Sequence, residues 1–165
     1  MILVHIRWRV PRDMPAILAI ESASFAYPLG EDALLAHLRE RNCIPMVAEH
    51  GERVVGFMVY NLHKTRIEII DFAVHPAFRR QGIGRQMVAK LINKLSSHQR
   101  TLLTLAVRET NLPGQLFFRS QGFRATSVVR EGYGNTGESA YVMEYVLDQP
   151  ESTPTTAATC HGWER

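Results

Sequence analysis

The chain has 165 residues, a net charge of +3 at neutral pH and an apolar share of 45%, which is typical of one soluble globular domain. Two distant cysteines argue against a disulfide scaffold or a CxxC site, and seven histidines without paired-ligand spacing predict no metal site. The charge is too small to indicate nucleic-acid binding, and no stretch approaches the roughly 18 apolar residues that span a bilayer. We therefore expect a cytoplasmic protein without a nucleic-acid or membrane partner.

The first half of the chain is predicted to form a strand, two helices and then three strands. Alternating β-prone residues indicate the first strand over residues 2–10. Asp13 is a favourable cap for the first helix, in which Met14, Ile17, Leu18 and Glu21 share one mostly apolar face. A second helix is expected from about Glu31. The three strands are expected, as an antiparallel meander, over residues 45–49, 54–61 and 64–74.

The most informative segment is the basic turn over residues 75–85, which joins the last of these strands to an amphipathic helix. Gly82 and Gly84 have no Cβ atom, so a ligand can approach the main chain closely. The helix that begins here directs its free N–H groups and the positive end of its dipole at that ligand. Together with Arg79, Arg80 and Arg85, this arrangement predicts a site for phosphate or pyrophosphate.

The second half completes a mixed layout of helices and strands. Apolar residues at helical spacing run from Ile83 to Leu95. The order β-α-α-β-β-β-α-β-α-β-β predicts an α+β domain over residues 1–148, with a mostly antiparallel sheet of about seven strands flanked by about four helices. Pro, Thr, Ser and Ala dominate residues 149–165, which we expect to form a flexible tail. The remaining elements are a strand over 101–107, a helix over 111–120, and strands over 123–130 and 139–147.

Two common phosphate-binding motifs do not fit the turn. A dinucleotide fold requires a third glycine where Met87 stands, a loop shorter than residues 75–81, and an acidic residue about 20 positions further on. A P-loop requires Gly-Lys-Ser/Thr after the turn, which the sequence lacks.

The segment Arg79-Arg80-Gln81-Gly82-Ile83-Gly84 instead resembles the acetyl-CoA signature of the GNAT acetyltransferase superfamily, Arg/Gln-x-x-Gly-x-Gly/Ala after the fourth strand. From about Arg7 to Val146 the chain is similar to the bacterial ribosomal-protein-alanine acetyltransferases, the RimI group. The other segments that carry this resemblance are residues 25–31, Asn111, Gly122-Phe123, residues 130–133 and residues 140–143.

The resemblance implies a sheet that splays near its middle and takes acetyl-CoA into the splay. The pantetheine arm would pair with the main chain of Phe72, Ala73 and Val74 as an added strand. Asn111 matches a residue that contacts the cofactor, although it is equally suited to a plain helix cap. The pyrophosphate would lie on main-chain N–H groups of Arg80, Gln81, Gly82, Ile83, Gly84 and Arg85, with Arg79 adding charge.

The chain departs from the family at both of the usual catalytic positions. Ala106 stands where the resemblance places a glutamate base, and Phe118 stands where it places a tyrosine acid. Glu68 is the best substitute base, because it matches the glutamate of a Glu-x-x-x-x-Ala pattern in other branches and lies in an apolar strand. The alternative is an ordinary exposed strand residue. Asp71, three residues on, points to the opposite face of a regular strand, but a bulge would change that parity.

The resemblance implies an enzyme that moves an acetyl group from acetyl-CoA to an amine, here the N-terminal α-amine of a protein. That N-terminus, from a ribosomal protein, would lie in a groove between residues 27–29 and the loop 132–134. Tyr133 would be an acid or a substrate contact there, or else a plain surface residue. Two alternatives remain: an acetyltransferase for a small amine, or a non-catalytic acetyl-CoA-binding module. The oligomeric state is not predicted.

Overall fold

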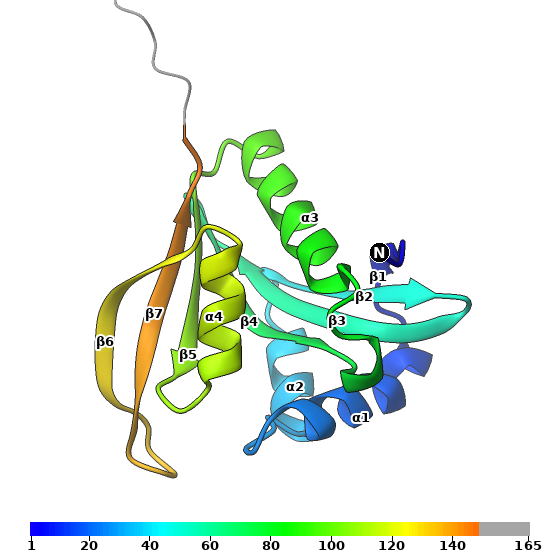
Figure 1. Ribbon diagram of the computed structural model, residues 1–165, viewed down its shortest axis with the longest axis horizontal. Helices are drawn as coiled ribbons and strands as arrows, with labels where there is room; N and C mark the ends of the chain where they lie inside the picture. Colours follow the sequence, from blue (N-terminus) through cyan, green and yellow to red (C-terminus); the bar gives the residue numbers. More distant parts are fainter. Residues whose placement is uncertain (149–165) are drawn as a thin grey trace, which may run out of the picture.

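The computed structural model describes residues 1–148, and the predicted tail at residues 149–165 lies outside the described residues. The strands within residues 1–148 form one seven-stranded sheet in the order β1-β2-β3-β4-β5-β7-β6 (Figure 1). The strands are β1 His5–Trp8, β2 Cys43–His50, β3 Arg53–Leu62, β4 Arg66–Val74, β5 Leu102–Arg108, β6 Arg124–Tyr133 and β7 Glu138–Val146. The helices are α1 Met14–Ser24, α2 Glu31–Leu38, α3 Ile83–Ser97 and α4 Leu112–Ser120, with 3-10 turns at Pro11–Asp13 and Pro76–Phe78.

The predicted element order, the mixed α+β class and the β2-β3-β4 meander are confirmed. The first strand is shorter than predicted, because pairing with β2 covers only His5 to Trp8. Asp13 precedes α1 as predicted, but its side chain makes no capping hydrogen bond to the helix. Its carboxylate instead accepts the Val10 N–H at 2.8 Å and two hydrogen bonds from the Arg7 guanidinium at 2.8 and 3.0 Å.

The predicted splay lies between β4 and β5, the parallel pair within residues 1–148. Their pairing runs from Arg66 opposite Leu102 to Ile69 opposite Leu105 and then stops. Beyond that point, β4 remains paired with β3 as far as Val74, and β5 remains paired with β7 as far as Arg108. The last residues of both strands therefore turn one main-chain edge toward a gap in the sheet.

Helices cover both faces of the sheet (Figure 1), and an apolar cluster lies on each face. On one face α3 and α4 pack against β3, β4 and β5, with Met87, Leu91 and Phe118 buried among strand residues. On the other face α1 and α2 pack against β2, β3 and β4, with Ile17 and Leu34 buried. The 3.6-residue spacing of these apolar side chains is what selects the helices and the faces they cover.

A bulge at Ile70 changes which face the end of β4 presents. Tyr60 pairs with Ile69 and Val59 pairs with Asp71, so Ile70 is an extra residue between them. Ile67 and Ile69 belong to the α3 cluster, whereas Ile70 and Ala73 belong to the α1 cluster. Glu68 and Ile70 alternate with those isoleucines, and the bulge adds Asp71 to the same face. The change of parity anticipated for Asp71 is therefore confirmed.

Replacing Asp13 by Asn should destabilise the fold and reduce its sensitivity to acid. The Arg7 ion pair holds the pKa of Asp13 below its ordinary value, so its stabilising contribution is present near neutral pH and is lost as the pH falls. We expect Asp13→Asn to lose about 1–3 kcal/mol of unfolding free energy at pH 7. Urea unfolding between acid and neutral pH measures this. The exposed control Asp32→Asn should keep the urea midpoint of the parent. An Asp13→Asn variant with the unfolding free energy and pH dependence of the parent would contradict a stabilising role of the Arg7–Asp13 ion pair.

Candidate active site

The basic turn leaves the end of β4 and enters α3 through two residues with left-handed main-chain conformation. Arg80 has φ +63° and Gly82, which precedes the first residue of α3, has φ +83°. This conformation is free for glycine but costs other residues about 1 kcal/mol or more, so Arg80 is held there by the turn around it. The turn thus begins a helix of 15 residues a short way after the end of β4, the strand whose last residues border the gap.

The turn offers a run of unpaired main-chain donors. Within residues 1–148, no acceptor takes a hydrogen bond from the N–H groups of residues 80 to 85, and the first bond into α3 runs from Gln86 N–H to the Gly82 carbonyl. These N–H groups coincide with the positive end of the α3 dipole, which favours an anionic ligand. The arrangement is the one the sequence predicts for Arg80, Gln81, Gly82, Ile83, Gly84 and Arg85.

The three arginines of the turn differ in their surroundings. Arg80 and Arg85 are exposed, so their guanidinium groups are available to a ligand. Arg79 instead donates to the Val74 carbonyl at 3.0 Å and to the Ser24 hydroxyl at 2.9 Å. Its guanidinium therefore ties the turn to the end of β4 and to α1, a structural contact that the sequence analysis did not anticipate.

Both glycines of the turn also lie in tight packing. A Cβ atom on Gly84 would stand 2.9 Å from the ring of Phe117 in α4, and one on Gly82 would stand 2.9 Å from the side chain of Met1. The N-terminal segment lies along the turn, because Ile2 N–H donates to the Gln81 carbonyl at 2.9 Å and the Gln86 side chain donates to the Ile2 carbonyl. Steric room for α4 and for the N-terminus is thus a second reason for these glycines.

The open edge of β4 is narrower than the predicted run of three residues. His75 N–H donates to the Val55 carbonyl of β3, so by alternation the main-chain groups of Phe72 and Val74 face the gap and those of Ala73 face β3. The Phe72 N–H is taken by the Asp71 carboxylate at 2.9 Å. The Phe72 carbonyl and the Val74 N–H remain for a strand-like ligand.

Aromatic rings support the gap on the α3 and α4 face. The ring centroid of Phe72 lies 5.8 Å from that of Phe117 and 5.4 Å from that of Phe118, and Phe118 stacks edge-on to Phe123 at 5.2 Å. Phe118 is 6% exposed, as expected of a core residue. Asn111 caps α4 by accepting the Gly114 N–H at 3.1 Å, which matches the cap reading of this residue.

The opposite face, toward α1 and α2, carries the candidate base. The Glu68 carboxylate accepts a hydrogen bond from His63 Nε2 at 2.8 Å, and 38% of the Glu68 side chain is exposed. It lies just before the end of β4–β5 pairing, opposite Thr104. Ala106 of β5 is exposed, and alternation along β5 places it on the same face of the sheet.

Arg108, at the end of β5, joins the α1–α2 loop to the end of β6, two segments that are far apart in the chain. Its guanidinium carbon lies 3.8 Å from the ring centroid of Tyr133 and 4.7 Å from that of Tyr27. Glu138 holds the guanidinium at 2.7 Å, and burial raises the pKa of the Tyr133 hydroxyl more than the positive charge of Arg108 lowers it. We call the region bounded by Glu68, Ala106, Arg108, Tyr27 and Tyr133 the acceptor face.

Sequence reasoning placed residues 27–29 and the loop 132–134 on the two sides of one groove but missed Arg108 as the link between them. The available signal is a lone arginine that ends a buried strand just before a helix cap. A second missed feature is the buried pair Glu21 and Asp71, 1% and 8% exposed. Both carboxyl groups interrupt apolar faces, which is unusual for charged residues without partners.

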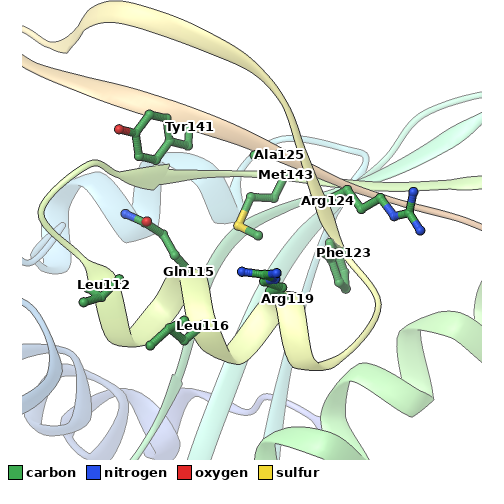
Figure 2. A pocket seen from close by; sticks show the side chains of 9 residues that line it. All are labelled: Leu112, Gln115, Leu116, Arg119, Phe123, Arg124, Ala125, Tyr141 and Met143. Carbon is green, nitrogen blue, oxygen red and sulfur yellow. The ribbon is translucent and has the colours of Figure 1, made fainter.

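A separate pocket of about 390 Å³ lies between α4 and the strands β6 and β7 (Figure 2). None of the site residues predicted from sequence lines it, and no carboxylate is among its lining side chains to form an ion pair with an ammonium group. Its lining residues are Leu112, Gln115, Leu116, Arg119, Phe123, Arg124, Ala125, Tyr141 and Met143.

Other classes of site are not indicated in the described part of the chain. Residues 1–148 contain no cluster of three potential metal ligands and no helix long and apolar enough to cross a membrane. Cys43 is half-buried, and burial raises the pKa of its thiol to about 11, which suppresses the nucleophilic thiolate.

Residues 14–123 match the family model described as acetyltransferase (GNAT) family. The chain belongs to this family. It is 28% identical over 133 residues to the [ribosomal protein bS18]-alanine N-acetyltransferase of Escherichia coli strain K12, covering 79% of this chain and 89% of that enzyme. The crystal structure of the ribosomal-protein-S18-alanine N-acetyltransferase from Escherichia coli superposes with a TM-score of 0.78 at 23% identity, covering 92% of this chain and 99% of the other.

Two more solved structures share the fold. A GNAT family acetyltransferase from Elizabethkingia anophelis with acetyl-CoA bound has a TM-score of 0.72 at 16% identity, covering 87% of this chain and 98% of that one. Naa50 from Arabidopsis thaliana, in complex with the bisubstrate analogue CoA-Ac-MVNAL, has a TM-score of 0.73 at 17% identity, covering 86% and 97%.

The chain is thus a GNAT-type, acetyl-CoA-dependent N-acetyltransferase, and the turn before α3 fits the cofactor. Its unpaired N–H groups and the two exposed arginines suit a pyrophosphate, and the open edge of β4 offers a donor and an acceptor to an extended amide chain.

Arg80→Gly should separate the charge of this turn from its shape. Glycine adopts the φ of +63° without strain, so the turn and the fold should be kept while one positive charge is lost. We expect affinity for coenzyme A to fall roughly three- to tenfold at low salt and by less at high salt. Isothermal titration measures it. Arg39→Gly, which removes an exposed arginine after α2, is the matched control, and an Arg80→Gly variant with parental affinity at low salt would contradict the prediction.

Proposed function

We propose that this acetyltransferase acts on the N-terminal α-amine of a protein, in the manner of the ribosomal-protein-alanine enzymes. The observation that carries the proposal is Arg108, which holds Tyr27 and Tyr133 together across the acceptor face. Two aromatic walls with a fixed guanidinium between them suit an extended peptide end with main-chain carbonyl groups. The curated relative at 28% identity is named for an alanine N-terminus, which supports the same acceptor class.

The chemistry requires one proton to leave the amine and one to reach the departing sulfur. Acetyl-CoA supplies the thioester, the amine nitrogen bonds to its carbonyl carbon, and the carbon–sulfur bond breaks. We assign the first proton to Glu68, which is half-exposed on the acceptor face near the end of β4–β5 pairing. Tyr133 remains our candidate for the second, because its raised pKa keeps the hydroxyl protonated.

An α-amine suits this sparse set of groups. Its ordinary pKa of about 8 leaves a useful neutral fraction near pH 7, whereas a lysine amine at about 10.4 needs a stronger base. Ala106 offers no such base. Glu68, acting directly or through water, can deprotonate an α-amine more readily than a lysine amine.

A peptide panel tests the acceptor class. We expect free thiol release with a peptide that begins with alanine, and mass spectrometry should place the acetyl group on its α-nitrogen. The same peptide with a blocked N-terminus and an internal lysine, and a set of small amines, should react far more slowly. Faster turnover of a lysine or a small amine would contradict the proposed acceptor.

Glu68→Gln tests the base. Loss of a general base lowers the rate by roughly 10²–10⁴-fold, and the loss should shrink as the pH rises toward the pKa of the acceptor amine. Ala106→Glu adds a carboxylate to the same face and should restore part of the rate in the Glu68→Gln background. Glu52→Gln, in the exposed β2–β3 turn, is the matched control. Full activity of Glu68→Gln at every pH would make Glu68 a structural residue only.

A further inference from the structure

A buried pair of carboxyl groups connects the open edge of β4 to the α1–α2 loop. The bulge at Ile70 turns Asp71 toward α1, where the charge and side chain of Glu21 act on its carboxyl group and help to raise its pKa. Only 1% of Glu21 and 8% of Asp71 is exposed, so water solvates neither group appreciably. Two ionised carboxylates in such a place would repel each other strongly.

The hydrogen bonds around the pair show where a proton is needed. Glu21 accepts main-chain N–H groups from Leu29 and, at 3.3 Å, from Gly30, so each of its two oxygens already has a donor. Asp71 accepts the Phe72 N–H through Oδ1 at 2.9 Å. Its Oδ2 is buried and has no hydrogen-bond partner among residues 1–148. A proton on Asp71 Oδ2, donated to Glu21, satisfies this atom.

The groups that surround Asp71 leave Glu21 as its main electrostatic partner. Burial, and then the negative charge of Glu21, raise the pKa of Asp71 to about 7, against a smaller opposing effect of the Phe72 N–H. Opposite it on β3 stands Val59, which is apolar, and the α1–α2 loop contributes main-chain amides.

The other charged groups nearby are committed elsewhere. Arg79, from the turn after β4, is bonded to Ser24 in the last turn of α1 and to a main-chain carbonyl. Glu68 on the same face of β4 pairs with His63, and Arg108 on β5 pairs with Glu138. None of these ion pairs includes Asp71 or Glu21.

We propose that Asp71 and Glu21 share one proton, and that this shared proton holds the α1–α2 loop in place beside the acceptor face. The consequence for catalysis rests on the proposed function, because Tyr27 of this loop is taken as a wall for the acceptor. Asp71 and Glu21 are positioning residues here, acting through the loop. The protonated pair is favoured at lower pH, so the loop is held below neutrality and released as the pH rises through about 7.

The first test needs neither cofactor nor acceptor. In ¹³C-labelled parent protein, the Asp71 carboxyl carbon should titrate near neutral pH, well above an ordinary aspartate. Hydrogen-exchange protection factors at Leu29 and Gly30, corrected for the intrinsic pH dependence of exchange, should fall at least roughly tenfold across the same range. Titration of Asp71 at an ordinary aspartate pH, with constant protection at both amides, would overturn the proposal.

Asp71→Asn supplies the matching variant. An asparagine amide donates to Glu21 at any pH, so protection at Leu29 and Gly30 should become independent of pH while remaining at the low-pH level. Asp148→Asn makes the same chemical change at an exposed position after β7 and should behave as the parent. If Asp71→Asn does not fold, Glu21→Gln should lower the pH at which Asp71 titrates, because the neighbouring charge is gone while the burial remains. An unaltered titration in Glu21→Gln would count against the pair.

Kinetics then connect the pair to the reaction. In the parent, KM for the acceptor peptide should rise roughly tenfold above neutral pH with a smaller change in kcat, and in Asp71→Asn this rise should disappear. If titration of Asp71 and protection of the loop change together but the acceptor KM does not, the shared proton is supported. The same result would contradict a role of the α1–α2 loop in the acceptor site. The failure of the proposed function is thereby distinguishable from failure of the shared proton.

Discussion

The early end of pairing between β4 and β5 is the constraint on which the rest of the molecule depends. Main-chain N–H and C=O groups inside a protein need partners, so two strands that diverge must have their free edges satisfied by something else. In this chain the Asp71 carboxylate takes the Phe72 N–H and the Arg79 guanidinium takes the Val74 carbonyl. The Phe72 carbonyl and the Val74 N–H remain available, which supports the gap as the proposed place of an extended ligand.

The two faces of that gap do different work because their side chains differ in kind. Phe118 of α4 stands edge-on to both Phe72 and Phe117, so the gap is supported on the α3 and α4 face by apolar area that does not compete for protons. The α1 and α2 face collects the carboxyl groups, and it does so because one extra residue, Ile70, puts Asp71 on the same side as Glu68. A strand without the bulge would bury Asp71 against the aromatic rings.

The sequence predicts well what depends on neighbouring residues and poorly what depends on distant ones. Apolar spacing located α3, and the glycines and basic residues located the turn before it, since a helix start and a left-handed residue are local features. The side-chain partners of Arg79 and Arg108 come from elements up to 81 positions away in the chain, such as Ser24 and Tyr27. Neither spacing nor composition encodes those contacts, and the position of the bulge is set by packing on both faces of β4.

The environments of the two faces explain why Ala106 and Phe118 can stand at the positions where the family has a glutamate and a tyrosine. Alternation places Ala106 on the α1 and α2 face, whereas Phe118 is 6% exposed among the rings of the opposite face. A hydroxyl at position 118 would therefore need a polar partner within an apolar cluster, and its absence spares the protein a buried unsatisfied group. A carboxylate at position 106 would stand close to the end of the gap, on the face that already carries Glu68 and the Asp71–Glu21 pair. Another negative charge there would favour protonation of its neighbours, so Ala106 limits the charge on a face that holds several acids.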